Sequence, residues 1–172
     1  NLAVVMPAVD RSFYTDMASG PRYYSFVSEE LPGLVRGWFP VSRLRRDTYV
    51  AGLSMGGYGA LLLGARLGPA RTAAIAAVSP ALWMSSGATA PGAFDGADDF
   101  AANSVFGLPA LGQIPIRIDC GDSDPFYSAT KQFIAQLPNG AAGGFSPGGH
   151  DGSFWSAQLP AEISWLAPLL VQ

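Results

Sequence analysis

The chain has 172 residues, of which 49% are hydrophobic and only 13% are charged, and its formal net charge is −3. This length and composition suit one globular domain with a buried core, and they exclude an intrinsically disordered chain. The lack of a basic excess makes nucleic acid a poor candidate for a partner, and the single cysteine, Cys120, excludes an internal disulfide framework and a cysteine zinc site.

Strand patterns alternate with helical patterns along the chain. In chain order they predict a buried strand (2–7), a loop (8–20), a helix (21–39), a buried strand (48–53), a helix (55–67), a strand (72–79), an irregular segment (80–112), a strand (114–121), a helix (126–137), a weak edge strand that runs into a loop (142–150) and a helix (153–171). This alternation predicts an α/β fold with a mostly parallel sheet.

Three features qualify these elements. Pro32 predicts a kink or break in the first helix, and Pro160 predicts an interruption of the last one. The irregular segment 80–112 has the length of a functional loop or small cap. The uncharged stretch 72–94 is broken by prolines and diluted by serines and glycines, so we expect no membrane span. With no internal repeat, residues 1–172 are expected to form a single domain.

The pentapeptide GLSMG (52–56) matches the G-x-S-x-G nucleophile elbow, and it stands where a strand becomes a helix, as that motif requires. The two glycines leave room for the sharp turn, and the backbone N–H of Met55 is a candidate oxyanion donor. The alternative, a glycine-rich turn that binds a phosphate, lacks the lysine or the G-x-G-x-x-G pattern that such turns carry. Ser54 is therefore the candidate nucleophile.

His150 is the only histidine, in a glycine-rich loop after the last strand pattern, and it is the candidate base. In hydrolases of this type the order is serine, acid, histidine. Asp124 is the favoured acid and Asp122 the alternative, while Asp119 lies inside the expected strand. The sequence SDPF also suits a helix N-cap at Asp124, a role compatible with catalysis. Such a triad carries acyl transfer through an acyl-enzyme and needs no metal or cofactor.

Several quoted segments together resemble the esterase D family, which includes S-formylglutathione hydrolases, tributyrin-type carboxylesterases and mycolyltransferases. They are LAVVMP, RSFYTD, EELPGLVRGWFP, TYVAGLSMGGYGALLLGARL, CGDSDPFY and GGHDGSFW. The resemblance implies an α/β-hydrolase fold, a three-layer sandwich with a mostly parallel sheet, and Ser54, Asp124 and His150 as the triad. It is strongest to the tributyrin-type esterases, so the expected substrates are short-chain acyl esters or thioesters.

In that family, strands and a His-Gly-type loop with a second oxyanion donor precede the segment that resembles LAVVMP. We therefore expect a chain that lacks the N-terminal third, with activity impaired unless a missing N-terminal segment associates with it; a homo-oligomer is a further hypothesis. Phe13, Tyr14 and Trp83 are the candidate substrate-binding residues, with ordinary packing as the alternative. Two other functions stay open: a non-catalytic fragment or binding domain, and an acyltransferase to an alcohol or sugar.

Overall fold

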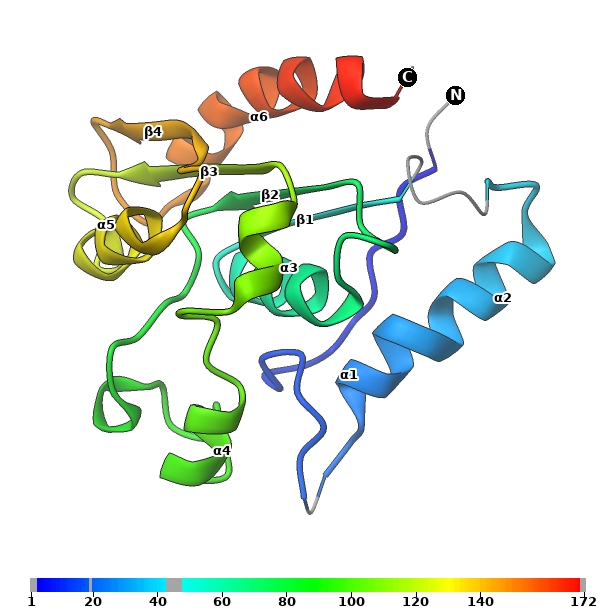
Figure 1. Ribbon diagram of the computed structural model, residues 1–172. Helices are drawn as coiled ribbons and strands as arrows, with labels where there is room; N and C mark the ends of the chain where they lie inside the picture. Colours follow the sequence, from blue (N-terminus) through cyan, green and yellow to red (C-terminus); the bar gives the residue numbers. More distant parts are fainter. Residues whose placement is uncertain (1–2, 19, 43–47, 171–172) are drawn as a thin grey trace.

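A four-stranded parallel sheet forms the centre of the molecule in the computed structural model, which describes residues 3–18, 20–42 and 48–170 (Figure 1). The strands are β1 (Tyr49–Leu53), β2 (Ala74–Val78), β3 (Ile116–Gly121) and β4 (Ala142–Ser146). They lie in the order β1-β2-β3-β4, and each neighbouring pair is parallel. The predicted α/β architecture is confirmed, and β4 is an edge strand as expected.

Helices cover both faces of this sheet. The helices are α1 (Tyr23–Ser25), α2 (Leu31–Trp38), α3 (Met55–Leu67), α4 (Ala97–Ala102), α5 (Tyr127–Gln136) and α6 (Gly152–Leu166). Figure 1 shows α6 on one face of the sheet and α3 and α5 on the other, which gives three layers. Within the described ranges, no helix is both long and apolar enough to cross a lipid bilayer.

The core lies between α3 and the central strands. Every residue of β2 is buried, because a parallel strand inside the sheet is covered on both faces. Helix α3 packs closely because it is rich in small residues: a Cβ on Gly64 would lie 2.3 Å from the Ile75 side chain. Leu61, Ile75 and Ile118 are completely buried, and each side chain of this kind stabilises the fold by about 1.5–3 kcal/mol. This packing fixes the start of α3 against the end of β1.

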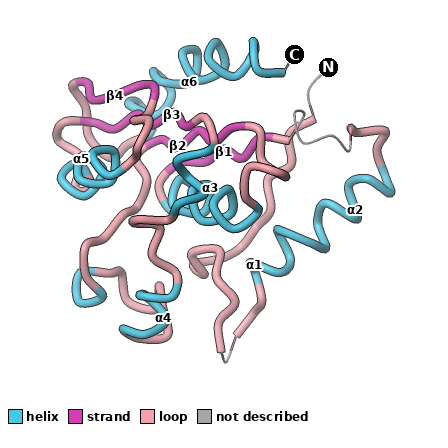
Figure 2. The backbone as a smooth tube through the Cα atoms, in the orientation of Figure 1, coloured by secondary structure: helices cyan, strands magenta, loops and turns pink. Residues whose placement is uncertain are grey.

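The strand predicted at residues 2–7 is wrong for its described part. Residues 3–7 form no strand (Figure 2), and Val4 and Met6 are 70% and 88% exposed. An apolar run becomes a strand only when a neighbour pairs with its backbone. Among the described residues, β2 is the sole strand paired with β1, so residues 3–7 do not use the free outer edge of β1.

The two prolines behave differently from each other. Before Pro32 the helix widens into a π-helical turn, Phe26–Glu30, so the regular pattern is broken there as expected. Pro32 cannot donate to the Ser28 carbonyl four residues earlier, and Arg71 Nη2 donates to that oxygen instead, at 3.1 Å. The interruption predicted at Pro160 is wrong, because α6 runs through it. Pro160 and Ser156 are both exposed, so water can reach the carbonyl that loses its donor.

The segment 80–112 is more ordered than the sequence suggested. It contains α4 and two 3₁₀ turns, Ser86–Ala88 and Pro109–Gln113. Its first residues, Ala81 and Leu82, are buried in the core. These short helices escape the periodicity test because each is less than two turns long or has no apolar stripe.

Candidate active site

Ser54 stands between β1 and α3 with a left-handed backbone, φ 54°. Backbone hydrogen bonds hold it on both sides: its N–H donates to Val78 O at 2.9 Å, and its carbonyl accepts from Ala81 N at 2.9 Å. The turn is tight enough that a Cβ on Gly52 would lie 2.2 Å from Gly56 O, which explains the glycine there. Ser54 is the N-cap residue of α3, yet its side chain makes no capping hydrogen bond. The hydroxyl therefore remains available for another partner.

That partner is His150. Its Nε2 lies 2.8 Å from Ser54 Oγ, and its Nδ1 lies 2.8 Å from Asp124 Oδ2. The loop that carries the imidazole follows β4, and it passes close to the end of β3: a Cβ on Gly121 would lie 2.2 Å from Gly148 O. Three residues far apart along the chain thus form one hydrogen-bonded row at the carboxyl ends of the parallel strands.

Of the three aspartates considered, Asp124 is the one that contacts His150. Its side chain is fully buried, and its second oxygen, Oδ1, accepts from Phe126 N at 2.8 Å. Asp122 is exposed and accepts from Ser123 Oγ and Gly148 N. Asp119 pairs instead with Arg117, at 2.7 Å. The predicted N-cap role of Asp124 is wrong, because α5 begins at Tyr127 with Phe126 as its N-cap residue.

Met55 is the first residue of α3. The N–H groups in the first turn of a helix have no acceptor within the helix, and the positive end of the helix dipole adds to their attraction for an anion. The Met55 N–H follows the hydroxyl-bearing Ser54 directly, so it suits an oxyanion that forms beside Ser54 Oγ.

Aromatic rings enclose the imidazole on two sides. The His150 ring lies 5.2 Å from Phe126 and 5.1 Å from Trp155, both in edge-on geometry. The Trp83 ring lies against the Phe126 ring, with a distance of 5.4 Å between the ring centres. Sequence reasoning missed Phe126, although its position two residues after Asp124 was a usable signal. The rings limit how far the imidazole can rotate away from Ser54.

The three predicted substrate-binding residues have different surroundings. Phe13 is 8% exposed and packs among Tyr58, Trp83 and Phe94, so its ring belongs to the core. Tyr14 is half-buried along α3, where a Cβ on Gly59 would lie 2.2 Å from its ring. Trp83 is half-buried between Phe13 and Phe126. Of the three predicted substrate-binding residues, Tyr14 and Trp83 are therefore the two whose side chains keep some exposed surface.

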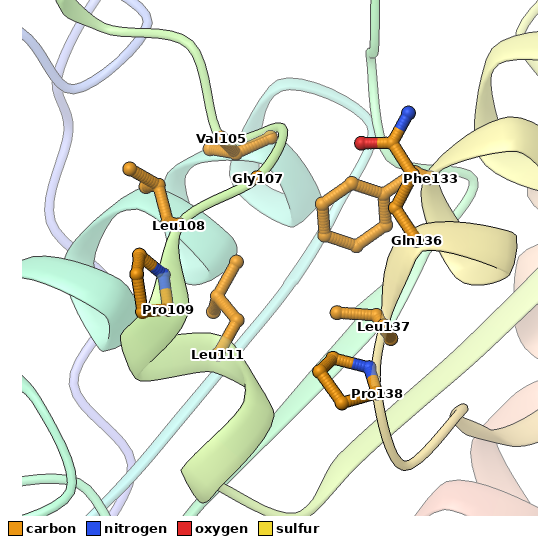
Figure 3. A pocket seen from close by; sticks show the side chains of 9 residues that line it. All are labelled: Val105, Gly107, Leu108, Pro109, Leu111, Phe133, Gln136, Leu137 and Pro138. Atoms are coloured by element: carbon orange, nitrogen blue, oxygen red, sulfur yellow. The ribbon is translucent and has the colours of Figure 1, made fainter.

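A small apolar cavity lies away from this site (Figure 3). It has a volume of about 80 Å³, and Leu108, Leu111, Phe133 and Leu137 are among its lining residues. These residues precede β3 and β4, so the cavity sits at the amino ends of the strands, opposite the row of Ser54, His150 and Asp124. In the part of the chain that the structure describes, no cluster of three or more His, Cys, Asp or Glu side chains could hold a metal ion.

Two ionisable groups outside the row, Cys120 on β3 and Glu162 on α6, have raised pKa values. Burial, helped by the neighbouring Asp124 carboxylate, raises the pKa of the Cys120 thiol to about 11, so this thiol is neutral at physiological pH. On α6, burial raises the pKa of Glu162 to about 7; the nearby Asp119 carboxylate raises it further, and Arg117 opposes this effect. Neither group is a hydrogen-bond partner of the His150 ring, whose nitrogens face Ser54 and Asp124.

Comparisons with known proteins show which family this chain resembles. The Esterase family model matches residues 2–166. An acetyl esterase of Caldicellulosiruptor saccharolyticus is 30% identical over an alignment 195 positions long, which covers 97% of this chain and 72% of that protein. The S-formylglutathione hydrolase of Mus musculus is 33% identical over 67% of this chain, but the match spans only 45% of the mouse protein. The family resemblance expected from the sequence is confirmed.

Solved structures give the same fold. The S-formylglutathione hydrolase of Staphylococcus aureus superposes with a TM-score of 0.68 at 26% identity, over 94% of this chain and 70% of that one. A fluorophosphonate-binding serine hydrolase of the same organism gives a TM-score of 0.72 at 22% identity, over 97% of this chain and 71% of that one. The three-layer arrangement is thus that of the α/β-hydrolases.

Proposed function

Because this chain belongs to the Esterase family and is a carboxylic ester hydrolase with the α/β-hydrolase fold, we propose that it cleaves short-chain acyl esters or thioesters through an acyl-enzyme on Ser54. The observation that supports this most strongly is the unbroken row of two contacts, each of 2.8 Å, from Ser54 Oγ through the His150 ring to Asp124 Oδ2. A hydroxyl, an imidazole and a carboxylate in this order are the groups that acyl transfer needs.

Each residue of the row has one task in this mechanism. His150 Nε2 takes the Ser54 proton as Oγ attacks the acyl carbon, and Asp124 holds the ring by accepting from Nδ1–H. The Met55 N–H stabilises the negative oxygen of the tetrahedral intermediate. The alcohol or thiol leaves with the proton from His150. A water molecule, activated by His150 in the same way, then releases the carboxylic acid and restores Ser54.

The preference for a short acyl group has two supports. The relatives of this chain include an acetyl esterase and S-formylglutathione hydrolases, whose names refer to acyl groups of one or two carbons. In addition, Trp83, Phe126 and Trp155 surround the imidazole with bulky rings. We assign Trp83 to the acyl side of the substrate, and Phe13 acts there by supporting Trp83 at 5.0 Å.

A fluorophosphonate probe tests the nucleophile. We expect the wild-type protein to be labelled and Ser54→Ala to be unlabelled. Ser123→Ala is the matched control, because this exposed serine lies next to Asp124 in sequence and bonds only Asp122 among the side chains. Intact mass after brief incubation with 4-nitrophenyl acetate should show one acetyl group on the wild type and the control. Persistent labelling of Ser54→Ala, or no labelling of folded wild type, would contradict the proposal.

A further inference from the structure

The Tyr14 side chain occupies a notch in α3 that two glycines create. A Cβ on Gly59 would lie 2.2 Å from Tyr14 Cδ2, so only a glycine admits the ring at that position. A Cβ on Gly56, nearly one turn closer to the start of α3, would lie 3.6 Å from the Tyr14 hydroxyl oxygen. The ring therefore runs along the helix with its hydroxyl toward the turn that begins at Met55, next to Ser54.

The chain holds Tyr14 there at an energetic cost. Phe13 and Tyr14 are consecutive aromatic residues with left-handed backbones, φ 48° and 58°. Such a conformation costs about 1–3 kcal/mol for each non-glycine residue and persists only where the surroundings enforce it. Here the Phe13 ring is anchored in the core, and Tyr14 N donates to Ser12 Oγ at 3.3 Å. The direction of the Tyr14 side chain is thus fixed from both ends.

The hydroxyl itself is uncommitted. Within the described part of the chain, the structure gives it no hydrogen-bond partner, and the side chain is half-buried. Burial raises the pKa of Tyr14 above its ordinary value of 10.0, so the phenol keeps its proton at neutral pH and can donate it in a hydrogen bond. The neighbouring Tyr58, by contrast, is fully engaged: its hydroxyl donates to Asn103 O at 2.6 Å.

Tyr14 and His150 reach the start of α3 from different parts of the molecule. A Cβ on Gly57 would lie 3.0 Å from Pro80, at the end of β2, whereas Gly59 faces Tyr14. Two residues correspond to about 200° around a helix, so Tyr14 lies on the flank away from β2. His150 and Asp124 come from the loops after β4 and β3, which lie beyond β2. An acyl carbonyl attacked by Ser54 needs the base on one side and oxyanion donors on another.

We propose that Tyr14 is a further catalytic residue, whose hydroxyl donates a second hydrogen bond, beside that of the Met55 N–H, to the oxyanion formed on a Ser54-bound acyl group. No bond to Tyr14 is made or broken, and its proton stays on the phenol oxygen. This inference rests on the proposed function, because it needs Ser54 to attack an acyl carbon. Removing one oxyanion donor typically lowers turnover by about 10²–10³-fold.

Steady-state hydrolysis of 4-nitrophenyl acetate by Tyr14→Phe tests the proposal. The variant keeps the ring in its notch and removes only the oxygen. We expect kcat to fall by about 10²-fold with little change in KM, because the lost bond exists only in the transition state. A trifluoromethyl ketone, which forms an oxyanion-like adduct with a serine, should also bind the variant more weakly by a similar factor.

Tyr58→Phe is the matched control, since it removes a phenol oxygen that is already engaged with Asn103 O and keeps the aromatic ring in place. Circular dichroism melts of both variants identify any loss of fold. If the wild type is active and Tyr14→Phe and Tyr58→Phe have equal kcat values, the inference is overturned while the proposed function stands. Wild type that neither hydrolyses the ester nor reacts with a fluorophosphonate would overturn both.

Discussion

Replacing Asp124 by asparagine changes one atom at the buried end of the hydrogen-bonded row of Ser54, His150 and Asp124. The two carboxylate oxygens face two donors: Oδ2 accepts from His150 Nδ1, and Oδ1 accepts from Phe126 N, each at 2.8 Å. An amide has one acceptor and one donor, so Asp124→Asn places a donor against a donor at one of these contacts. Because the Asp124 side chain is fully buried, no bulk water can relieve the conflict.

Both orientations of the amide harm the site. If its oxygen keeps the Phe126 contact, its NH₂ faces Nδ1, and the imidazole must carry its proton on Nε2. That nitrogen then cannot accept the Ser54 proton. If the amide turns over, Phe126 N loses its acceptor, which costs about 1–3 kcal/mol of stability. The wrong tautomer lowers kcat by about 10⁴-fold in enzymes with this kind of triad, or about 5.5 kcal/mol in the activation free energy.

The assay is steady-state hydrolysis of 4-nitrophenyl acetate, with thermal melts to verify folding. Asp122→Asn is the control: it makes the same chemical change two residues away, at an exposed side chain that contacts Ser123 and Gly148 rather than His150. We expect that variant to keep activity within a few-fold of wild type. Equal activity of both variants, or a larger loss in Asp122→Asn, would refute this account of the acid.

Two further predictions concern the Glu162 carboxyl group and the Cys120 thiol. Folding raises the pKa of Glu162 from its ordinary value of 4.5 to about 7. Between pH 4.5 and 7 the folded state therefore keeps a proton on Glu162 that the unfolded chain has released, so the free energy of unfolding should fall as the pH rises through this range. Since Glu162 is partly exposed, we expect a loss of about 1–2 kcal/mol between pH 4.5 and 8 in urea unfolding, abolished in Glu162→Gln; an unchanged slope in that variant would contradict it. Cys120 is completely buried with a pKa of about 11, so Ellman's reagent should label it only after denaturation. Rapid labelling of native protein would show that the thiol is accessible.

The strand and helix patterns predicted the sheet because its strands are covered on both faces. Strand β2 and helix α3 are buried along nearly their whole length, so apolar content and small residues report their environment directly. The segment 2–7 has the same apolar character, but a strand also needs a paired neighbour, which composition does not reveal. Pro160 was predicted to interrupt α6 and does not. Whether a proline breaks a helix depends on whether that face of the helix is exposed to water, which is set by the tertiary structure and not by the local sequence.

The candidate site was predictable from the sequence at positions where a local motif fixes the backbone. It was not predictable at positions that depend on packing between segments far apart in the chain. The strand-to-helix turn at Ser54 follows from glycines within two residues of it. The choice between Asp122 and Asp124 depends on how the loop after β3 meets the His150 loop, and the sequence left that choice open. The contacts of Phe126 with His150, and of Tyr14 with α3, join segments far apart in the chain, so no local pattern announces them.

The left-handed backbone of Ser54 also bears on which residue suits this position best. At φ 54° a glycine would be unstrained, whereas a serine costs about 1–2 kcal/mol, and the Ser54 side chain contributes no helix cap in return. The residue that makes the fold most stable at position 54 is therefore one that cannot attack an ester. Natural variants or designs selected for thermal resistance alone would therefore tend to lose the hydroxyl on which the proposed function depends.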